Sequence, residues 1–312
     1  MELLNWNKVK HLDLPFSNLK WSNTHMQTPV PYVYKNKLIV FYGTRDENNN
    51  SSISWVELNG NNNFKVVKSP KKPLLTKGDL GCFDDSGVIP SSIVKIKNKY
   101  FLYYMGWSQA KNVPSQNAGG LAEIDFETMQ AHKVFKGPIL DRTRNEPQYC
   151  TCPRVYKIKN KYFMYYLGVN QWIDSIDKKD ATYEIRIGTS TNGIDWVRDN
   201  TKALPLKNKQ GGHYPFSVLK FENKFYGFYS SRNRLDFREN PSDAYKIYLA
   251  ESPNGLDWKM INNINIQRTD DTYDNIMQAY PSVIKFNESI LLFYNGNNFG
   301  KNGIEIAINK NH

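Results

Sequence analysis

One pattern of apolar and polar positions recurs five times along this chain. Each copy begins with a proline that opens an apolar segment, passes through a short polar turn, and ends in an aromatic segment closed by Tyr-Tyr or Phe-Tyr. Apolar and aromatic segments favour β-strands, and the polar turn between them predicts an antiparallel pair. The copies occupy residues 29–42, 90–104, 153–166, 215–229 and 281–294.

The spacing of the copies predicts how the strand pairs are arranged. The leading prolines lie 61, 63, 62 and 66 residues apart, at Pro29, Pro90, Pro153, Pro215 and Pro281. A nearly fixed period of sheet-like units indicates radial repetition, in which each unit buries its faces against its neighbours. We therefore expect an all-β fold, a five-bladed β-propeller of four-stranded antiparallel blades. A propeller gathers loops from every blade around one central pocket.

The repeats leave no room for a second domain, so we expect residues 1–312 to form a single propeller. The last blade ends after its third strand. We expect the N-terminal segment 5–9, which resembles the segments that begin at Asp195 and Asp257, to supply the missing outer strand. This pairing would close the ring and remove exposed sheet edges. The blades are expected at about 25–70, 84–136, 146–201, 213–265 and 274–308.

Two turns share the sequence Ser-x-Asn-Gly-x-x-Trp, at residues 190–196 and 252–258, and lie 62 residues apart. Asn-Gly supplies the positive φ that a tight hairpin requires. At the edge of a blade such turns are far from the axis, so we expect them to be structural.

Composition restricts the class of protein. The chain has 40% hydrophobic and 14% aromatic residues, which is enough for a sizeable core. It has neither a signal peptide nor a stretch of 18 apolar residues, so we expect a cytoplasmic protein without a membrane span. Three cysteines do not suit a disulfide framework. We expect no cofactor and no metal; a metal site of Cys150, Cys152 and His213 is a weaker alternative.

The chain is basic, with 41 Lys and Arg against 30 Asp and Glu, a net charge of +11. Many lysines fall in the polar turns, where solvated charge is the ordinary interpretation. The alternative is a field that attracts an anionic substrate, such as a sugar phosphate, a nucleotide sugar or an acidic polysaccharide. The chain shows no compact Arg-rich cluster or basic helix, so we expect no nucleic-acid partner. Nothing in the sequence predicts the oligomeric state.

Polar residues precede the repeated prolines. Because the first strand of a propeller blade lines the axis, these residues should approach the pocket, and convergent polar groups are typical of a ligand site. Two carboxyl groups that flank a glycosidic bond suffice to cleave it. The alternative for each acid is a turn or cap residue that accepts hydrogen bonds from backbone amides. The candidate catalytic carboxylates are Asp84, Asp85, Glu146 and Asp274.

Other polar and aromatic residues at the same end of the blades could bind a substrate. Arginine grips a carboxylate or phosphate through two parallel hydrogen bonds, and flat aromatic faces stack on sugar rings. Packing in the core is the competing role for each aromatic side chain. The candidate binding residues are His25, Gln27, Arg45, Asp46, Trp107, Arg142, Arg154, His213, Arg232 and Tyr280, with Trp172 as a further flat face.

Several segments support a family resemblance. They are 27–29 (Gln-Thr-Pro), 44–46 (Thr-Arg-Asp), 83–90 (Phe-Asp-Asp-Ser-Gly-Val-Ile-Pro), 104–107 (Tyr-Met-Gly-Trp), 137–142 (Gly-Pro-Ile-Leu-Asp-Arg) and 293–297 (Phe-Tyr-Asn-Gly-Asn). With them the chain resembles, over essentially its whole length, the five-bladed propeller proteins related to arabinanases, xylosidases and invertases. More narrowly it resembles a glycosidase-like branch linked to bacterial surface-polysaccharide biosynthesis. The resemblance implies this fold and activity on carbohydrates.

The chain departs from that family at the catalytic positions. Arabinanase-like enzymes carry an Asp beside the first-blade proline, an Asp beside the second and a Glu beside the third. Here those neighbourhoods hold Thr28, Ser91 and Cys152, and Glu146 stands seven residues before Pro153. The family's set therefore does not transfer position by position. A glycosidase would need a rearranged set, namely Asp84 or Asp85, Glu146 and Asp274.

Two functions remain open. The first is an enzyme that hydrolyses a glycosidic bond or transfers the sugar, with Glu146 as the proton donor and Asp84 or Asp85 as the base or nucleophile. Arg45, His25 and His213 would hold hydroxyls or an anionic group of a carbohydrate or sugar-nucleotide substrate. The arginines favour a charged donor, as in a glycosyltransferase or phosphorylase. The second is a carbohydrate-binding propeller that has lost the catalytic set, since fold alone does not determine function.

Overall fold

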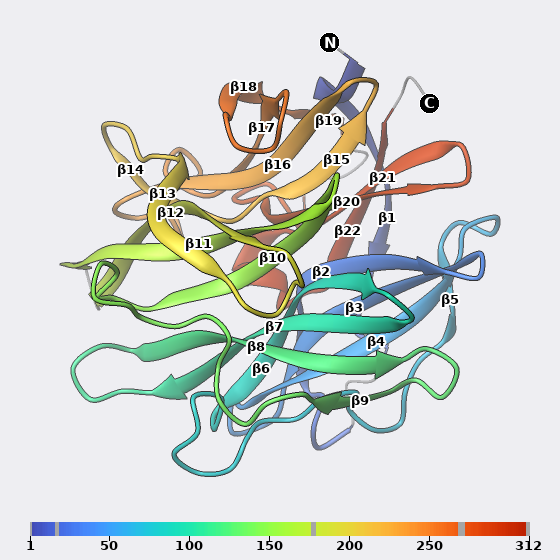
Figure 1. The fold of residues 1–312 in the computed structure, drawn as a ribbon. Coiled ribbons are helices and arrows are strands. Elements are labelled where there is room, and N and C mark those ends of the chain that lie inside the picture. Colours follow the sequence, from blue (N-terminus) through green and yellow to red (C-terminus); the bar gives the residue numbers. More distant parts are fainter. Residues whose placement is uncertain (1, 16–18, 176–178, 268–271, 310–312) are drawn as a thin grey trace.

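The computed structural model describes residues 2–15, 19–175, 179–267 and 272–309. Within these residues the structure is built from β-strands, with short 3₁₀ turns at η1 (Glu2–Leu4) and η2 (Asn297–Gly300) and no α-helix. The predicted all-β class is confirmed (Figure 1). No helix in the described part of the chain is long and apolar enough to cross a membrane.

Most strands pair with their neighbours in sequence as antiparallel meanders. The first meander contains β2 (Thr24–Tyr34), β3 (Lys37–Arg45), β4 (Ser51–Asn59) and β5 (Lys65–Lys68). The second contains β6 (Gly87–Ile96), β7 (Lys99–Gln109), β8 (Ser115–Asp125) and β9 (Gln130–Lys133). The third contains β10 (Cys150–Ile158), β11 (Lys161–Asp174), β12 (Lys179–Ser190) and β13 (Val197–Leu204).

The fourth meander has an interrupted first strand. Both β14 (Gln210–His213) and β15 (Ser217–Phe221) pair with β16 (Lys224–Asn233), which is followed by β17 (Lys246–Ser252) and β18 (Lys259–Asn263). Single parallel bridges, Ser51↔Gly87 and Tyr183↔Gly212, connect the first meander to the second and the third to the fourth.

The fifth meander combines both ends of the chain. It contains β20 (Ala279–Phe286), β21 (Ser289–Asn295) and β22 (Ile304–Asn309), and its fourth strand is the N-terminal β1 (Asn5–Leu12). β1 pairs antiparallel with β22, from Trp6↔Asn309 to Leu12↔Ile304, and parallel with the short β19 (Asn265–Gln267). The N-terminal segment therefore has the partner that the sequence predicts, over a longer strand than residues 5–9.

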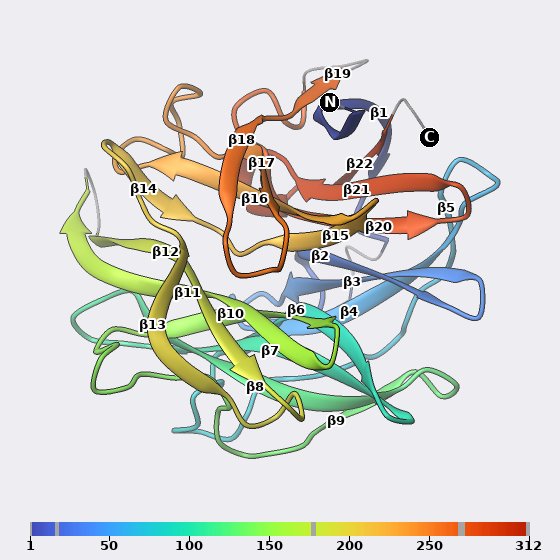
Figure 2. The ribbon, with the colours of Figure 1, turned by 45° about the horizontal axis from the view of Figure 1, so that its top comes forward.

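Hydrogen bonds join three pairs of neighbouring first strands. Thr28 Oγ1 on β2 donates to the carbonyl of Pro90 on β6 at 3.3 Å, and Ser92 Oγ on β6 donates to the carbonyl of Pro153 on β10 at 3.0 Å. The backbone amide of Val283 on β20 donates to Ser217 Oγ on β15 at 2.8 Å. In Figure 2 these first strands lie toward the middle of the ribbon, and β5, β9 and β13 lie toward its periphery.

The repeated prolines distort the first strands in a regular way. The residues before three of them, Thr28, Cys152 and Tyr280, have φ values of 53°, 54° and 56°, and the pairing register shifts at the same places. Proline cannot donate to a strand ladder, so it is tolerated in a sheet at such a bulge. A bulge bends the strand and re-aims side chains. The residues just before the prolines are thereby turned out of the regular alternation.

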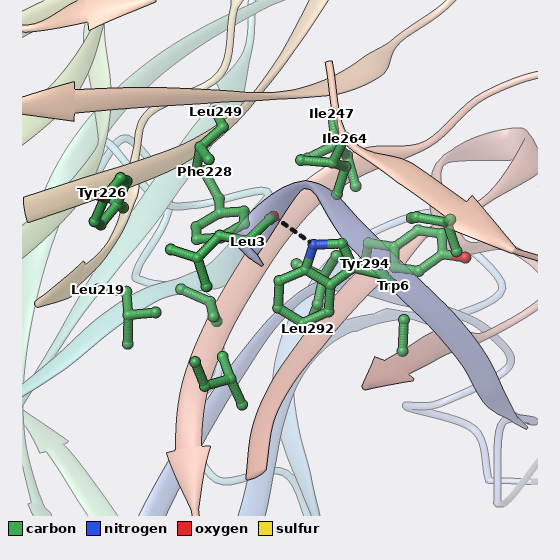
Figure 3. Close-up of a cluster of buried hydrophobic side chains, with 14 residues drawn as sticks. Leu3, Trp6, Leu219, Tyr226, Phe228, Ile247, Leu249, Ile264, Leu292 and Tyr294 are labelled. Carbon is green, nitrogen blue, oxygen red and sulfur yellow. Dashed lines mark hydrogen bonds between the residues drawn. The ribbon is translucent and has the colours of Figure 1, made fainter. Parts of the chain in front are cut away.

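Apolar side chains fill the spaces between neighbouring meanders. Figure 3 shows one such cluster, in which Trp6 of β1 lies among side chains of the fourth and fifth meanders, including Phe228 and Leu292. Trp6 is fully buried, and its Nε1 donates to the carbonyl of Leu3 at 2.9 Å. A buried tryptophan that also satisfies its N–H contributes strongly to packing. The N-terminal strand is therefore part of the core.

The two Asn-Gly turns also hold meanders together. Tyr103 of the second meander donates to the carbonyl of Gly193 at 2.6 Å, and Tyr165 of the third donates to the carbonyl of Gly255 at 2.7 Å. Each turn thus accepts a hydrogen bond from a buried tyrosine of the preceding meander, which fits the structural role expected for it.

Candidate functional site

One pocket receives side chains from all five meanders and has a volume of about 560 Å³. We call it the central pocket. Its aromatic lining is Tyr149, Trp172, Tyr183, Phe237, Tyr245, Tyr280 and Phe299. Its charged lining is Arg45, Lys179, Asp180, Arg232 and Arg238, and its neutral polar lining includes His25, Gln27, Asn49 and Ser115. Flat apolar faces with a few convergent polar groups are typical of a small-molecule site.

Arg45 stands at the end of β3 and is held by uncharged groups. Its Nη1 donates to Asn49 Oδ1 at 2.9 Å, and its Nη2 donates to Gln27 Oε1 at 3.3 Å. The guanidinium lies over the Trp107 ring, 5.7 Å from the centroid. Burial lowers the pKa of Arg45 from its ordinary value, because the charged form is less well solvated. No carboxylate of the described residues forms an ion pair with it.

Arg232 on β16 is more deeply buried, with 3% of its surface exposed. Its Nε donates to Tyr245 Oη at 3.2 Å, and its Nη2 donates to the carbonyl of Ala181 at 2.7 Å. Its guanidinium stacks on Phe237 at 3.8 Å from the ring centroid. These partners are neutral, and the described part of the chain offers no carboxylate in contact with it. The charge of Asp180 acts on Arg232 without a direct ion pair, so the buried cation is only partly compensated, which is costly.

Asp180 is the only carboxylate among the described residues that line the central pocket. Arg238 donates to both of its oxygens, at 2.9 and 2.7 Å. Burial works to raise the pKa of Asp180, but the hydrogen bonds and charge of Arg238, with a further contribution from the charge of Arg232, outweigh burial and lower that pKa. Asp180 is therefore ionised at neutral pH.

His25 lies beside Arg45 with a φ of 69°. Its Nδ1 is hydrogen-bonded to Thr24 Oγ1 at 2.8 Å. Burial, followed by the charges of Arg45 and Lys301, lowers the pKa of His25 to about 4. The imidazole is therefore neutral at pH 7 and adds no charge. A positive φ is a strained backbone conformation for histidine, and such strain clusters at functional sites.

Three of the predicted catalytic acids are buried outside the central pocket, in equivalent places. Each accepts a hydrogen bond from the tyrosine 20 residues later. Each also forms an ion pair with a cation on the fourth strand of its own meander. The groups are Asp84 with Tyr104 (3.1 Å) and Lys133 (2.6 Å), Glu146 with Tyr166 (2.6 Å) and Arg198 (2.8 Å), and Asp274 with Tyr294 (2.7 Å) and Lys8 (3.5 Å).

These three acids are thus not brought together. Each carboxylate is almost fully buried and is compensated by a cation, as expected of a charge that fixes an outer strand to its meander. A catalytic role for Asp84, Glu146 and Asp274 stays a prediction, and their contacts favour a structural one.

Asp85 lines a different hollow of about 430 Å³, together with Asn117, Asp141 and Arg142. Its Oδ2 accepts a hydrogen bond from the Gly81 amide at 3.0 Å, and its Oδ1 accepts one from Ser86 Oγ at 3.0 Å. Both oxygens of Asp85 are therefore used to shape its loop. The two predicted site residues Asp85 and Arg142 share this hollow, and neither lines the central pocket.

The predicted binding residues separate into two groups. His25, Gln27, Arg45, Arg232 and Tyr280 line the central pocket, as does Trp172. Asp46 instead accepts hydrogen bonds from the amides of Asn48 and Asn50 and closes the loop after β3. Trp107 does not line the central pocket, and its ring packs against the Arg45 guanidinium. His213 is buried against Tyr229, and Arg154 is buried among the first strands.

Sequence reasoning missed part of the pocket. Tyr183 and Tyr245 stand 62 residues apart, one repeat period, so the period itself contained the signal. Asp180 lies at the start of β12, and Phe237 and Arg238 lie in the loop between β16 and β17. No repeated motif marks these three residues, because loops between repeats vary independently of the strands.

The possible metal ligands Cys150, Cys152 and His213 do not form a recognisable site. Cys152 Sγ contacts Met105 Sδ at 3.6 Å, and burial raises the pKa of the Cys152 thiol to about 11. A thiol must lose its proton to bind a metal. Among the described residues no group of three or more His, Cys, Asp or Glu side chains could hold a metal ion.

Comparisons with known proteins agree with this architecture. No protein-family model matches the chain. The chain is 27% identical over 308 residues to "Uncharacterized protein Rv1502" of Mycobacterium tuberculosis (strain H37Rv), covering 98% of this chain and 99% of that protein. A second Mycobacterium tuberculosis protein, "Uncharacterized protein MT1551" (strain CDC 1551), is likewise 27% identical over 308 residues, with the same coverage.

Among solved structures, one from a study titled "The GH130 family of mannoside phosphorylases contains glycoside hydrolases that target beta-1,2 mannosidic linkages in Candida mannan" superposes with a TM-score of 0.73 at 14% identity, covering 98% of this chain and 94% of that one. A glycosyl hydrolase from Bacteroides ovatus gives 0.72 at 14% identity, covering 97% and 93%. An exo-1,5-alpha-L-arabinanase from a bovine ruminal metagenomic library gives 0.62 at 12% identity, covering 91% and 92%. At these identities the similarity shows the fold alone.

Proposed function

We propose that the protein is a five-bladed β-propeller that acts on a glycosidic bond of an anionic carbohydrate in its central pocket. The five meanders, the hydrogen bonds between their first strands and the pairing of β1 with β22 support the ring. The similarity to glycoside hydrolases and phosphorylases supports the class of reaction. The family resemblance adds surface-polysaccharide biosynthesis as the setting.

The observation that carries this proposal is the pair of arginines without a carboxylate. Arg45 and Arg232 line one pocket, both are largely withdrawn from solvent, and both are hydrogen-bonded to neutral groups only. A phosphate or carboxylate on the ligand would supply the missing charge through charge-assisted hydrogen bonds. The surrounding rings, among them Tyr280 and Trp172, offer faces for a sugar. An anionic sugar therefore fits the pocket better than a neutral one.

The charges of the pocket suit a donor whose sugar is attached to phosphate, such as a glycosyl phosphate or a nucleotide sugar. In the transfer step the bond between C1 and the phosphate oxygen breaks, and its electron pair stays on the phosphate, which Arg45 and Arg232 stabilise. An acceptor hydroxyl oxygen bonds to C1, and its proton passes to the Asp180 carboxylate. The leaving group needs no proton, so one ionised carboxylate suffices.

The test is a turnover assay with a binding assay on the same samples. Glycosyl phosphates and nucleotide sugars are incubated with the protein and a set of saccharide acceptors, and released phosphate or nucleotide is measured. Arg45→Gln should weaken donor binding by roughly 10- to 100-fold. The matched control is Arg234→Gln, an exposed arginine outside the pocket, which should change nothing. Equal binding by both variants would contradict the proposal.

A second candidate is a carbohydrate-binding protein without turnover. The pairing of Asp180 with Arg238 favours it, because a carboxylate held by two hydrogen bonds is a poorer base than a free one. The two candidates differ in one variant. If the wild type turns over donors and Asp180→Asn keeps donor affinity but loses turnover, the protein is an enzyme. If the wild type binds and no sample turns over, it is a binding protein.

A further inference from the structure

Arg154 breaks the repeat at the centre of the molecule. Opposite the first residue of the aromatic pair that closes each repeat, β6, β15 and β20 place serines, in the pairs Ser92↔Tyr103, Ser217↔Phe228 and Ser282↔Phe293. β10 places Arg154 there, opposite Tyr165. The repeat itself therefore accepts a small side chain at this position, and the guanidinium needs an explanation of its own.

The Arg154 guanidinium is almost fully buried, with 1% of the residue exposed. Its Nη1 donates to the carbonyl of Pro281 at 3.2 Å and to Ser282 Oγ at 3.3 Å, and its Cζ lies 5.3 Å from the centroid of the Tyr214 ring. No carboxylate of the described residues pairs with it. A buried charge without a counter-charge costs several kcal/mol, so this arrangement calls for an anion.

The unused hydrogen-bond donors of Arg154 lie on one edge. Its Nε and Nη2 are buried and have no partner at ordinary hydrogen-bond geometry among the described residues, although the phenols of Tyr214 and Tyr156 lie close enough to interact with the guanidinium. In a guanidinium these two atoms share an edge, and their N–H bonds point in parallel, which is the geometry that grips an anion. The remaining edge is occupied by the contacts with Pro281 and Ser282.

A second unpaired donor lies on the neighbouring first strand. Ser91 Oγ on β6 is buried and has no partner among the described residues. Its neighbour Ser92 holds β6 against β10, since Ser92 Oγ donates to the Pro153 carbonyl at 3.0 Å and accepts from the Val155 amide at 3.0 Å. Two adjacent first strands, β6 and β10, thus each keep a buried polar side chain with an unsatisfied donor.

We propose that Arg154 binds a small monovalent inorganic anion, of the halide class, between the first strands. The site is closed toward the central pocket, because Arg154 does not line the pocket and Tyr214 packs against the pocket residue Tyr280 with ring centroids 4.6 Å apart. The bound anion would neutralise the guanidinium and fix β10, β6 and β20 to one another. This site is independent of the function proposed for the central pocket.

The test is thermal unfolding in sodium gluconate, in which gluconate is replaced stepwise by chloride or bromide at constant ionic strength. The wild type should melt higher as halide replaces gluconate, by roughly 4 °C at a halide concentration about 100 times Kd. Arg154→Met should lose this dependence. Ser282→Ala is the matched control, because it removes a neighbouring hydroxyl and keeps the guanidinium, and it should retain the dependence. Anomalous diffraction from a bromide-soaked crystal should place bromide at Nε and Nη2.

A wild type that melts at the same temperature in gluconate and in halide would overturn the proposal, as would an Arg154→Met variant with undiminished halide dependence. A water molecule at the guanidinium in the bromide-soaked crystal would do the same. If Arg154→Met fails to fold, the wild type, the Ser282→Ala variant and the bromide position decide the outcome.

Discussion

The buried acids of the meanders and the arginines of the central pocket are opposite solutions to the burial of charge. Asp84, Glu146 and Asp274 each meet a tyrosine and a cation of the same meander. Arg45 and Arg232 meet only neutral groups. Removing one partner of a compensated buried charge leaves the other unpaired and destabilises the fold, whereas a charge left without an ion pair is available to a ligand. The partner, rather than the residue type, distinguishes the two roles.

The largest effect is expected when a compensated acid is removed. Glu146→Gln leaves the partly buried Arg198 without its carboxylate and the buried Arg186 with only the longer pair to Glu184, so we expect a loss of ~3–5 kcal/mol and a melting temperature lower by roughly 5–8 °C. Asp85→Asn, at a partly exposed loop, should cost much less. Calorimetry measures both. A Glu146→Gln protein of unchanged stability that has lost turnover would show that Glu146 is catalytic and not one of the structural charges.

Removing a charge that has no ion pair should reduce ligand affinity and leave stability nearly unchanged. Arg45→Gln is expected to reduce affinity for an anionic sugar by roughly 10- to 100-fold while the melting temperature stays close to that of the wild type, because no carboxylate loses its partner. Titration calorimetry with a glycosyl phosphate, together with thermal unfolding, checks both halves. A large loss of stability with unchanged affinity would place Arg45 with the structural charges.

The tyrosines at equivalent positions sharpen the comparison. Tyr166 donates to the buried Glu146 at 2.6 Å, whereas the buried Tyr229 Oη has no partner among the described residues. Tyr166→Phe should cost ~1.5–3 kcal/mol, the usual value of a hydrogen bond to a charged group. Tyr229→Phe should be neutral or slightly stabilising. Urea unfolding of both variants measures the difference. Equal losses of stability would show that the hydrogen bond to Glu146 does not stabilise the fold.

The smallest effect concerns the junction of the chain ends. His11 on β1 faces Glu305 on β22, with Nδ1 2.6 Å from Oε1. Burial disfavours the imidazolium, but the hydrogen bond and charge of Glu305 outweigh burial and raise the pKa of His11 above 6.5. This contribution to stability is complete below pH 6.5 and is lost as pH rises through the folded-state pKa.

Between pH 6 and pH 8 the wild type should therefore lose a little more stability than His11→Gln does. Urea unfolding at a series of pH values provides the measurement. Parallel pH profiles for the two proteins would mean that the contact between β1 and β22 does not depend on the imidazolium.

Several elements could be predicted from particular residues. The prolines from Pro29 to Pro281 and the aromatic pairs mark the first two strands of each meander, and the similar Trp6 and Trp196 surroundings identify β1 as an outer strand. The pocket residues just before the prolines, such as His25 and Tyr280, could be predicted for the same reason. The partners of the acids could not be, since Arg198 lies 52 residues from Glu146 and Lys8 lies 266 residues from Asp274.

The sequence by itself determined the strand pairs, their period and the all-β class, because these depend on local patterns of apolar, aromatic and turn residues. Only the tertiary structure decided which polar side chains face the central pocket and which are compensated inside a meander. Those outcomes depend on the register shifts at the prolines, which re-aim side chains. They also depend on contacts between residues far apart in the chain, where charges are either matched or left for a ligand.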